Sequence, residues 1–392
     1  MGKNHLIKCS KSIYSFNMKV LLIDQIAKVN FRYTYPLVNG LTKNGADVEL
    51  VMDLKYEDEN CNCKKYRWFN TDEKNIGKIQ KIKNYIASYF KILNLVKKHK
   101  YDVIQTEWFI LSPLDYIFLK RIKRMSKAKL VITVHDILPF NKAFYDFYFH
   151  SKLYGLADKI ILQAPGNESR FLKLFPKEFS KIRIIPHGHM LDYVDSVGKS
   201  VGRKYLNIPN EKIVLLFFGQ IKKVKGVDIL LNAMSMLKEK YPNLFVVIAG
   251  SVWKADFSEC EKIIESNNLN DCLRLDVKYI PDDEIKYYYS AADACVLPYT
   301  DVYQSGVIQL SYGYKKVVVS SDLPSFTQFV KEGVSGFISK RGDSLSLAAA
   351  IERLIANQEN LKKMGLNGYN LVKSELDWDK LTKQVITDCY KQ

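Results

Sequence analysis

The chain has 392 residues, more than one hydrophobic core usually supports, so its length favours two domains of ordinary size. Hydrophobic residues make up 47% and charged residues 26% of the chain, which excludes a largely disordered or collagen-like protein. No run of ~18 consecutive apolar residues is present, so no membrane-spanning helix is expected. Residues 1–17 lack the apolar core of a secretory signal, and the seven cysteines are dispersed. Both features favour reduced thiols and a cytoplasmic location.

The net charge of +17 is concentrated in the first half of the chain. Residues 1–200 hold 34 Lys and Arg against 19 Asp and Glu, whereas residues 201–392 hold 25 against 23. A basic half indicates an anionic partner, either a membrane surface, a nucleic acid or a phosphorylated substrate, unless the lysines only make the surface soluble. Because the basic residues are dispersed and no nucleic-acid-binding motif is present, no nucleic acid is expected as a partner.

Twelve short apolar runs recur along the chain, each followed by a helical pattern. Near-continuous β-branched runs are typical of strands covered on both faces, and their alternation with helices predicts parallel sheets. The expected fold is therefore α/β, with two doubly wound Rossmann-like domains facing a central cleft. The runs lie at residues 19–24, 47–52, 102–105, 129–134, 158–162, 181–185, 212–218, 244–248, 273–277, 294–297, 316–319 and 336–338.

A polar stretch at 192–210 with little periodicity marks the change of domain. We therefore expect an N-terminal extension at 1–17, a first domain at 18–200 and a second domain at 201–372. The last helix, from about residue 363 to 392, is long for a terminal cap. Its final part, 373–392, is expected to cross back to the first domain.

Residues 76–96 have apolar side chains at helical spacing with lysines between them, which predicts an amphipathic, basic helix. Such a helix suits peripheral contact with an anionic membrane, at the inner face of the cell membrane. Its place between the second and third runs also fits a helix that packs its apolar face on the sheet. Both interpretations remain open from the sequence. The apolar positions are 76, 79, 82, 86, 89, 90, 93 and 96.

The clearest chemical motif follows the run at 212–218. The strand is expected to end at Gly219 and a helix to begin near Gly226, where glycine permits a tight turn and a close approach to a ligand. Lys222 and Lys225 lie in the loop between them. Two ammonium groups at this place can neutralise a diphosphate and stabilise it as a leaving group. A solvated lysine cluster at a strand–helix turn is the plain alternative.

Two further motifs follow buried strands in the second half. In the first, Ser305 is a good helix N-cap, and the free backbone amides of Gly306 and Val307 would form an anion site. In the second, the backbone before Pro281 is expected to be extended and could present its polar groups to a flat base. An ordinary capped helix and an ordinary turn are the alternatives.

Taken in order, these motifs resemble the second domain of the GT-B-fold, family-4 glycosyltransferases over about residues 212–372. The resemblance continues more weakly through the first domain, at Thr133–Asp136 (TVHD) and Ile185–Gly188 (IPHG), and covers nearly all of the chain except residues 1–17. The segments that carry it are FFGQIKKVKGVDILLNA, VVIAGS, YIPDDEIKYYYSAADACVLPY, QSGVIQLSYGYKKVVVSSD and GVSGFI.

The resemblance implies a hexosyltransferase that moves a sugar from a nucleotide-diphosphate sugar, with retention, to a saccharide acceptor that is lipid-linked in many members. Capsule or O-antigen synthesis would be a typical pathway. No metal or other cofactor is implied beyond the nucleotide sugar. By position, Lys222 and Lys225 would hold the diphosphate and His135 would face the donor sugar. The donor-binding positions would be Gly219, Tyr279, Ile280, Gln304, Ser305, Gly306 and Val307, with Tyr279 and Ile280 beside the base.

The chain departs from the family in its acidic residues. Many members carry two glutamates across the region of 302–310, where this chain has Gln304 and Gln309 as the nearest polar groups. The QSG sequence resembles a variant of the donor motif, so activity is still expected. A catalytically weak or inactive sugar-binding subunit is the main alternative, and an epimerase of the same fold is another. In the first domain, Arg32 would bind an acceptor phosphate or be a plain surface charge.

Overall fold

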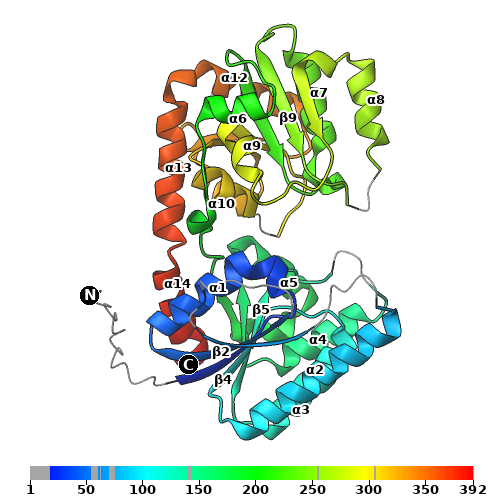
Figure 1. Ribbon diagram of the computed structural model, residues 1–392, viewed down its shortest axis with the longest axis vertical. Helices are drawn as coiled ribbons and strands as arrows, with labels where there is room; N and C mark the ends of the chain where they lie inside the picture. The colour runs from blue at the N-terminus through cyan, green and yellow to red at the C-terminus, as the bar shows by residue number, and fades with distance from the viewer. Residues whose placement is uncertain are drawn as a thin grey trace, which may run out of the picture.

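The computed structural model describes residues 18–53, 61, 63–69, 76–139, 143–253, 256–303 and 306–391. They form two α/β domains, one above the other in Figure 1, and the chain passes between them twice. The extension expected at residues 1–17 lies outside the described residues. No helix in the described part of the chain is long and apolar enough to cross a membrane.

The first domain is built on a seven-stranded parallel sheet with the strand order β3-β2-β1-β4-β5-β6-β7. The apolar runs at its centre are buried because helices cover both faces of the sheet. Its elements are β1 (Met18–Ile23), α1 (Ala27–Lys43), β2 (Ala46–Asp53), β3 (Lys64–Phe69), α2 (Lys78–Lys98), β4 (Val103–Thr106), α3 (Ser112–Met125), β5 (Lys129–Val134), α4 (Asp146–Leu156), β6 (Lys159–Leu162), α5 (Pro165–Leu174), η1 (Pro176–Lys181) and β7 (Ile182–Ile184).

The second domain has a six-stranded parallel sheet with the order β10-β9-β8-β11-β12-β13. Two doubly wound sheets of this kind confirm the expected fold class. The elements, with those of the linker and the C-terminus, are η2 (Leu191–Tyr193), α6 (Lys199–Tyr205), β8 (Ile213–Phe218), η3 (Lys223–Lys225), α7 (Val227–Leu237), β9 (Leu244–Ala249), α8 (Ser258–Ser266), η4 (Asn270–Cys272), β10 (Leu273–Asp276), α9 (Ile285–Ala291), β11 (Ala294–Leu297), α10 (Gly306–Gly313), β12 (Val317–Ser321), α11 (Pro324–Thr327), β13 (Gly336–Ser339), α12 (Ser344–Ala356), η5 (Gln358–Asn360), α13 (Leu361–Glu375), α14 (Trp378–Val385) and η6 (Ile386–Lys391).

All twelve strands expected from apolar runs are present, and β3 is a thirteenth that the sequence did not indicate. Its sequence, KKYRWF, mixes charged and aromatic residues, and only Phe69 is buried. The pattern is that of an edge strand, which needs no continuous apolar run because one of its sides faces solvent.

The C-terminal segment corrects one expectation, because the single helix predicted from about 363 to 392 is interrupted. α13 ends at Glu375, and Asp377 caps a new helix, α14, by accepting a hydrogen bond from the Lys380 amide at 2.9 Å. α14 and η6 lie on the first domain, where Thr382 packs against Gly40 of α1 and the Tyr390 hydroxyl donates to Gln105 Oε1 at 2.5 Å.

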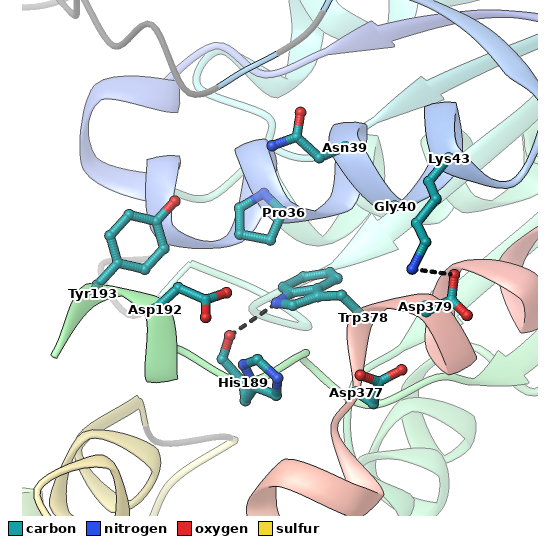
Figure 2. A pocket seen from close by; sticks show the side chains of 10 residues that line it. All are labelled: Pro36, Asn39, Gly40, Lys43, His189, Asp192, Tyr193, Asp377, Trp378 and Asp379. Carbon is teal, nitrogen blue, oxygen red and sulfur yellow. Dashed lines mark hydrogen bonds and ion pairs between the residues drawn. The ribbon is translucent and has the colours of Figure 1, made fainter. Parts of the chain in front are cut away.

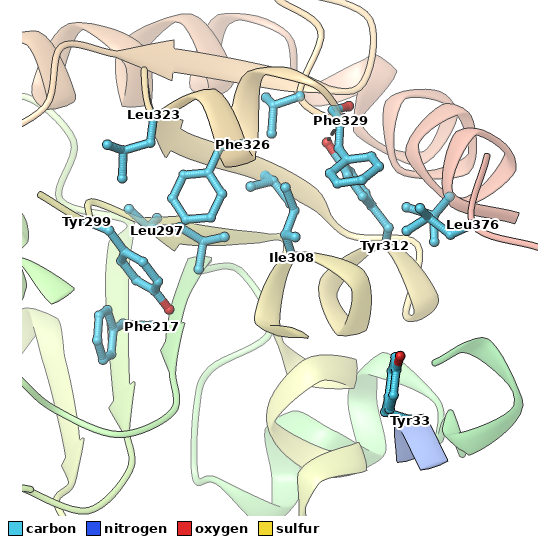
Figure 3. Packing of buried hydrophobic residues seen from close by; sticks show 14 of the residues in the cluster. Tyr33, Phe217, Leu297, Tyr299, Ile308, Tyr312, Leu323, Phe326, Phe329 and Leu376 are labelled. Carbon is cyan, nitrogen blue, oxygen red and sulfur yellow. Dashed lines mark hydrogen bonds between the residues drawn. The ribbon is translucent and has the colours of Figure 1, made fainter. Parts of the chain in front are cut away.

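Trp378, where the chain passes back to the first domain, contacts the linker in which the chain first leaves that domain. Its indole N–H donates to the carbonyl of His189 in the linker at 2.8 Å, and both residues line a cavity of about 610 Å³ between α1 and the two crossings (Figure 2). The Trp378 ring also meets the edge of Tyr33, at 5.4 Å between centroids. In Figure 3, Tyr33 points from α1 toward the packed aromatic and aliphatic residues of the second domain. One apolar cluster therefore runs through both domains and supports their relative placement.

Candidate active site

The carboxyl end of β8 lies against the start of α10. Gly219 has a φ of +115°, and a Cβ placed there would lie 3.5 Å from a methyl group of Val307. On its other side, a Cβ on Gly250 would lie 1.9 Å from the Gly219 carbonyl oxygen, so the two backbones touch. The fold thus brings Gly219 together with Gly306 and Val307, the first residues of α10. Gln304 and Ser305 lie outside the described residues.

The loop that carries the lysines packs tightly against the loop after β11. Gly226 has a φ of +68°, and a Cβ there would lie 2.1 Å from the Pro298 carbonyl oxygen. The Thr300 amide also donates to the Val224 carbonyl at 2.9 Å. Glycine is required at position 226 for both the left-handed backbone and the close approach. These contacts fix the position of the loop that carries Lys222 and Lys225.

Lys225 is a partly buried lysine whose surroundings disfavour its charged form. Its Nζ lies 3.7 Å from the centroid of the buried Tyr299 ring. Burial and the neighbouring charge of Lys222 lower the pKa of Lys225 to about 7. No acidic side chain of the described residues offsets these two effects. A buried ammonium without a counter-ion is unfavourable, and an anion in the cleft would relieve it.

The two other lysines of this loop differ in surroundings. Lys222 lies over the Trp253 ring, with its Nζ 5.8 Å from the centroid. Lys223 is exposed and pairs with Glu259 at 2.6 Å and with Asp228 at 3.4 Å. Lys223 therefore forms surface ion pairs, which leaves Lys222 and Lys225 as the two lysines of this loop that we expect to bind an anion.

The opposite wall comes from the first domain, after β4 and β5. His135 is buried, and its Nε2 lies 3.0 Å from Oε2 of the buried Glu107. The ring stacks on Trp108 with centroids 4.5 Å apart and planes within 5°, and the edge of Tyr33 meets it at 5.0 Å. These contacts hold the imidazole in one orientation. Glu107 and Trp108 were not predicted, although both follow a predicted strand directly.

Asp136 extends this wall toward the second domain. Burial raises the pKa of the Asp136 carboxyl, and the charges of His135 and Lys222 oppose that shift. The charge of Asp136 in turn helps to raise the pKa of Tyr303, in the loop before α10. Asp136 is therefore within electrostatic reach of both second-domain loops. The interaction of Asp136 with Lys222 thus links the His135 wall of the first domain to the lysine loop of the second.

Two ion pairs join the domains beside this cleft. Arg170 of α5 forms a bidentate pair with Asp301, with nitrogen–oxygen distances of 2.7 and 3.1 Å, and lies 4.3 Å from the centroid of the Tyr303 ring. Arg32 of α1 pairs with Asp282 at 2.8 Å. Arg32 is thus an interdomain contact, which neither of the two sequence interpretations anticipated.

The residues expected beside a base differ in exposure. The Tyr279 side chain is 71% exposed, whereas Ile280 is buried in an apolar cluster of the second domain. Only the backbone of Ile280 is available to a ligand, and a base site at this place remains a prediction. Within the described ranges, no three His, Cys, Asp or Glu side chains are grouped so that they could hold a metal ion. Metal-free chemistry stays a prediction.

The domains match two glycosyltransferase families. Residues 31–193 match the model described as Glycosyltransferase Family 4, and residues 199–371 match the model described as Glycosyl transferases group 1. Each match covers less than half of the chain, but together they span both domains. Each of the two domains therefore resembles a glycosyltransferase family model.

Curated relatives are distant in sequence. The chain is 25% identical over 234 residues to D-inositol 3-phosphate glycosyltransferase of Thermobifida fusca, covering 58% of this chain and 54% of that protein. It is 24% identical over 310 residues to lipopolysaccharide 1,2-N-acetylglucosaminetransferase of Salmonella typhimurium, covering 72% and 79%. The match thus spans only about half the length of the first of these relatives.

Solved structures show the same fold at low identity. Sucrose-phosphate synthase from Thermosynechococcus elongatus has a TM-score of 0.74 at 19% identity, over 96% of this chain and 98% of that chain. HepE from Anabaena, in complex with UDP, has a TM-score of 0.73 at 16% identity, over 96% and 100%. The protein has the GT-B fold.

Proposed function

We propose that this protein of GT-B fold and family-4 domain type is a glycosyltransferase that uses a nucleotide-diphosphate sugar as its donor. The observation that carries the proposal is the partly buried Lys225, which has Lys222 beside it and no acidic partner among the described residues. The HepE structure holds UDP and a starch synthase structure of the same fold holds ADP, which supports a nucleoside diphosphate as the anion.

In this reaction the protein mainly has to stabilise charge and position the two substrates. As the bond between the anomeric carbon and the diphosphate breaks, negative charge grows on the phosphates and positive charge grows on the sugar ring. The ammonium groups of Lys222 and Lys225, with the first amides of α10, would stabilise the departing diphosphate. The acceptor hydroxyl would be held at the anomeric carbon, which supplies proximity.

Retention follows if the acceptor attacks from the face that the diphosphate leaves. The leaving phosphate would then take the acceptor's proton, so no covalent sugar–protein bond is needed. His135 would stand beside the sugar, with its orientation set by Glu107 and Trp108. We propose a hexosyl group as the group transferred, in the synthesis of a cell-surface polysaccharide such as capsule or O-antigen.

A thermal-shift screen of the full chain against nucleoside diphosphates and their sugars tests the proposal. A donor at a hundredfold excess over its dissociation constant would stabilise the folded state by ~2.7 kcal/mol. Slow hydrolysis of the same nucleotide sugar, followed by release of the nucleoside diphosphate, separates an enzyme from the alternative of an inactive sugar-binding subunit. Binding of no member of the panel would refute the proposal.

The basic first domain suits a lipid-linked acceptor and peripheral contact with an anionic membrane. Helix α2 has features of both interpretations of its sequence, a helix packed on the sheet and a helix on a membrane surface. Its second half packs on the sheet through Tyr89, Ile92 and Val96, but Ile79 is 74% exposed and Phe90 is 54% exposed. Exposed lysines of the same helix lie beside these apolar side chains, as a membrane-surface helix requires.

Sedimentation with vesicles tests the membrane contact. The full chain should sediment with vesicles that contain phosphatidylserine and stay in solution with phosphatidylcholine alone, because the attraction is to anionic headgroups. Ile79→Ser should weaken sedimentation, whereas Leu345→Ser, an equally exposed change in α12 of the second domain, should not. Equal sedimentation with both lipids, or no effect of Ile79→Ser, would contradict the contact.

A further inference from the structure

A small cavity lies in the first-domain wall beside His135. Its volume is about 110 Å³, and it lies where β4 and β5 end. The volume gives room for the edge of one sugar ring and not for a longer chain. The residues that line it include Glu107, Trp108, His135, Asp136, His150 and Tyr154.

Two polar groups of this lining are without hydrogen bonds. The indole N–H of Trp108 is buried and has no partner among the described residues, although stacking on His135 holds the ring in place. The Asp136 carboxylate likewise accepts no hydrogen bond within the described part of the chain. A buried donor without a partner costs free energy and needs an explanation, which a ligand can provide.

One residue that lines the cavity, Asp136, interacts electrostatically with the loops proposed to hold the donor. Asp136 is within electrostatic reach of Lys222 in one second-domain loop and of Tyr303 in another. A glycosyl group attached to a diphosphate at Lys222 and Lys225 would extend from these ammonium groups toward Asp136. The unpaired donor and acceptor of the cavity would then meet the sugar.

We infer that this cavity receives a hydroxyl-bearing edge of the donor sugar and that Asp136 makes the site selective for neutral sugars over carboxylated ones. This inference rests on the proposed function. A hydroxyl group is both acceptor and donor, so it can accept from the Trp108 N–H and donate to Asp136. A sugar carboxylate cannot donate, and it would face the negative charges of Asp136 and Glu107. Like charges at such a contact oppose binding strongly.

The test compares glucose 1-phosphate with glucuronic acid 1-phosphate, two probes that differ at C6 and need no knowledge of the base. Ligand-observed NMR titrations would use the full wild-type chain and three variants. Asp136→Asn removes the charge in the same shape. Trp108→Phe removes the N–H and keeps a ring against His135. Asp47→Asn is the matched control, an exposed carboxylate at the start of β2, away from the cleft.

We expect wild-type protein and the Asp47→Asn variant to bind glucose 1-phosphate roughly tenfold or more tightly than glucuronic acid 1-phosphate. Asp136→Asn should reduce this ratio to about twofold, mainly because the affinity for glucuronic acid 1-phosphate increases. Trp108→Phe should weaken glucose 1-phosphate by roughly threefold to tenfold, the effect of one hydrogen bond. A merely structural role of Asp136 would lower both affinities and leave the ratio unchanged.

An unchanged ratio in Asp136→Asn, or equal affinities in the wild type, would overturn this inference. So would binding of UDP, ADP or GDP without binding of either sugar phosphate, and that result would leave the proposed function intact. If no member of the nucleoside diphosphate and nucleotide-sugar panel bound, the proposed function would fail and this inference with it.

Discussion

The pKa of Lys225 makes donor binding dependent on pH. In the free protein, burial and Lys222 lower this pKa to about 7, so the side chain is mostly neutral above pH 8. A diphosphate bound beside it favours the charged form and should return the pKa toward its ordinary value of ~10.4. Binding therefore takes up a proton whenever the pH lies between these two values.

The magnitude follows from the two pKa values. At pH 6, Lys225 is charged in both states, so binding takes up only ~0.1 proton. At pH 8, binding should take up ~0.9 proton, and the affinity should be about tenfold lower than at pH 6. A nucleotide sugar is the right probe, because its diphosphate has no terminal ionisable oxygen to titrate over this range.

Calorimetry in two buffers of different ionisation enthalpy measures both the affinity and the proton uptake. Lys225→Met should bind weakly at pH 6 and lose the dependence on pH. Lys223→Met, the same change two residues away in a lysine paired with Glu259, should retain the wild-type affinity and profile. The difference between wild type and Lys225→Met separates Lys225 from every other titrating group. A flat wild-type profile, or wild-type affinity in Lys225→Met, would refute the reasoning.

Further measurements address stability and the placement of the domains. Lys225→Met should raise the Tm of the ligand-free protein at pH 7, because the lowered pKa of Lys225 means that its charged form is disfavoured in the folded state. For the same reason, the stability of the wild type should rise with pH above about 7. An unchanged or lower Tm in the variant would show that the Lys225 charge is not disfavoured in the folded state. Gly226→Ala should destabilise the protein by ~2–4 kcal/mol in urea unfolding, because its Cβ would clash with the carbonyl oxygen of Pro298. The control, Gly342→Ala, has a similar φ of +74° but open space around it, so it should cost only ~1–2 kcal/mol. Equal losses in the two variants would disprove the close approach at Gly226. A double-mutant cycle with Arg170→Ala and Asp301→Ala should give a coupling of ~0.5–1 kcal/mol, and X-ray scattering of either variant should show a more open molecule; unchanged scattering would show that the pair does not hold the domains. Trp378→Phe should lose ~1 kcal/mol with its hydrogen bond to the linker, and a change near zero in thermal unfolding would contradict that bond.

The strands could be predicted because their signal is local. A strand covered on both faces must be apolar along its whole length, so twelve runs of the sequence correspond to twelve strands of the structure. β3 could not be recognised in this way, because an edge strand tolerates charged and aromatic residues in alternation. The break between α13 and α14 was also missed, although the Asp377 cap was present in the sequence.

The lysine loop could likewise be recognised from the sequence. Gly219, Lys222, Lys225 and Gly226 lie within eight positions of one another, directly after a buried strand. The strand–turn–helix order alone directs this loop to the carboxyl edge of the sheet, where ligands of such folds bind. The positions predicted at the start of α10, Gly306 and Val307, reach the same edge for the same reason.

The opposite wall and the joining of the domains were decided by tertiary structure. Nothing in the sequence indicates that Glu107 holds His135, that Arg170 meets Asp301, or that an arginine in α1 pairs with an aspartate of the second domain. These partners are separated by tens to hundreds of residues, and each contact depends on how two folded sheets face each other. Sequence periodicity and turn chemistry report only on neighbours along the chain, so the strands and their loops could be predicted, whereas the pairing of charges across the cleft could not.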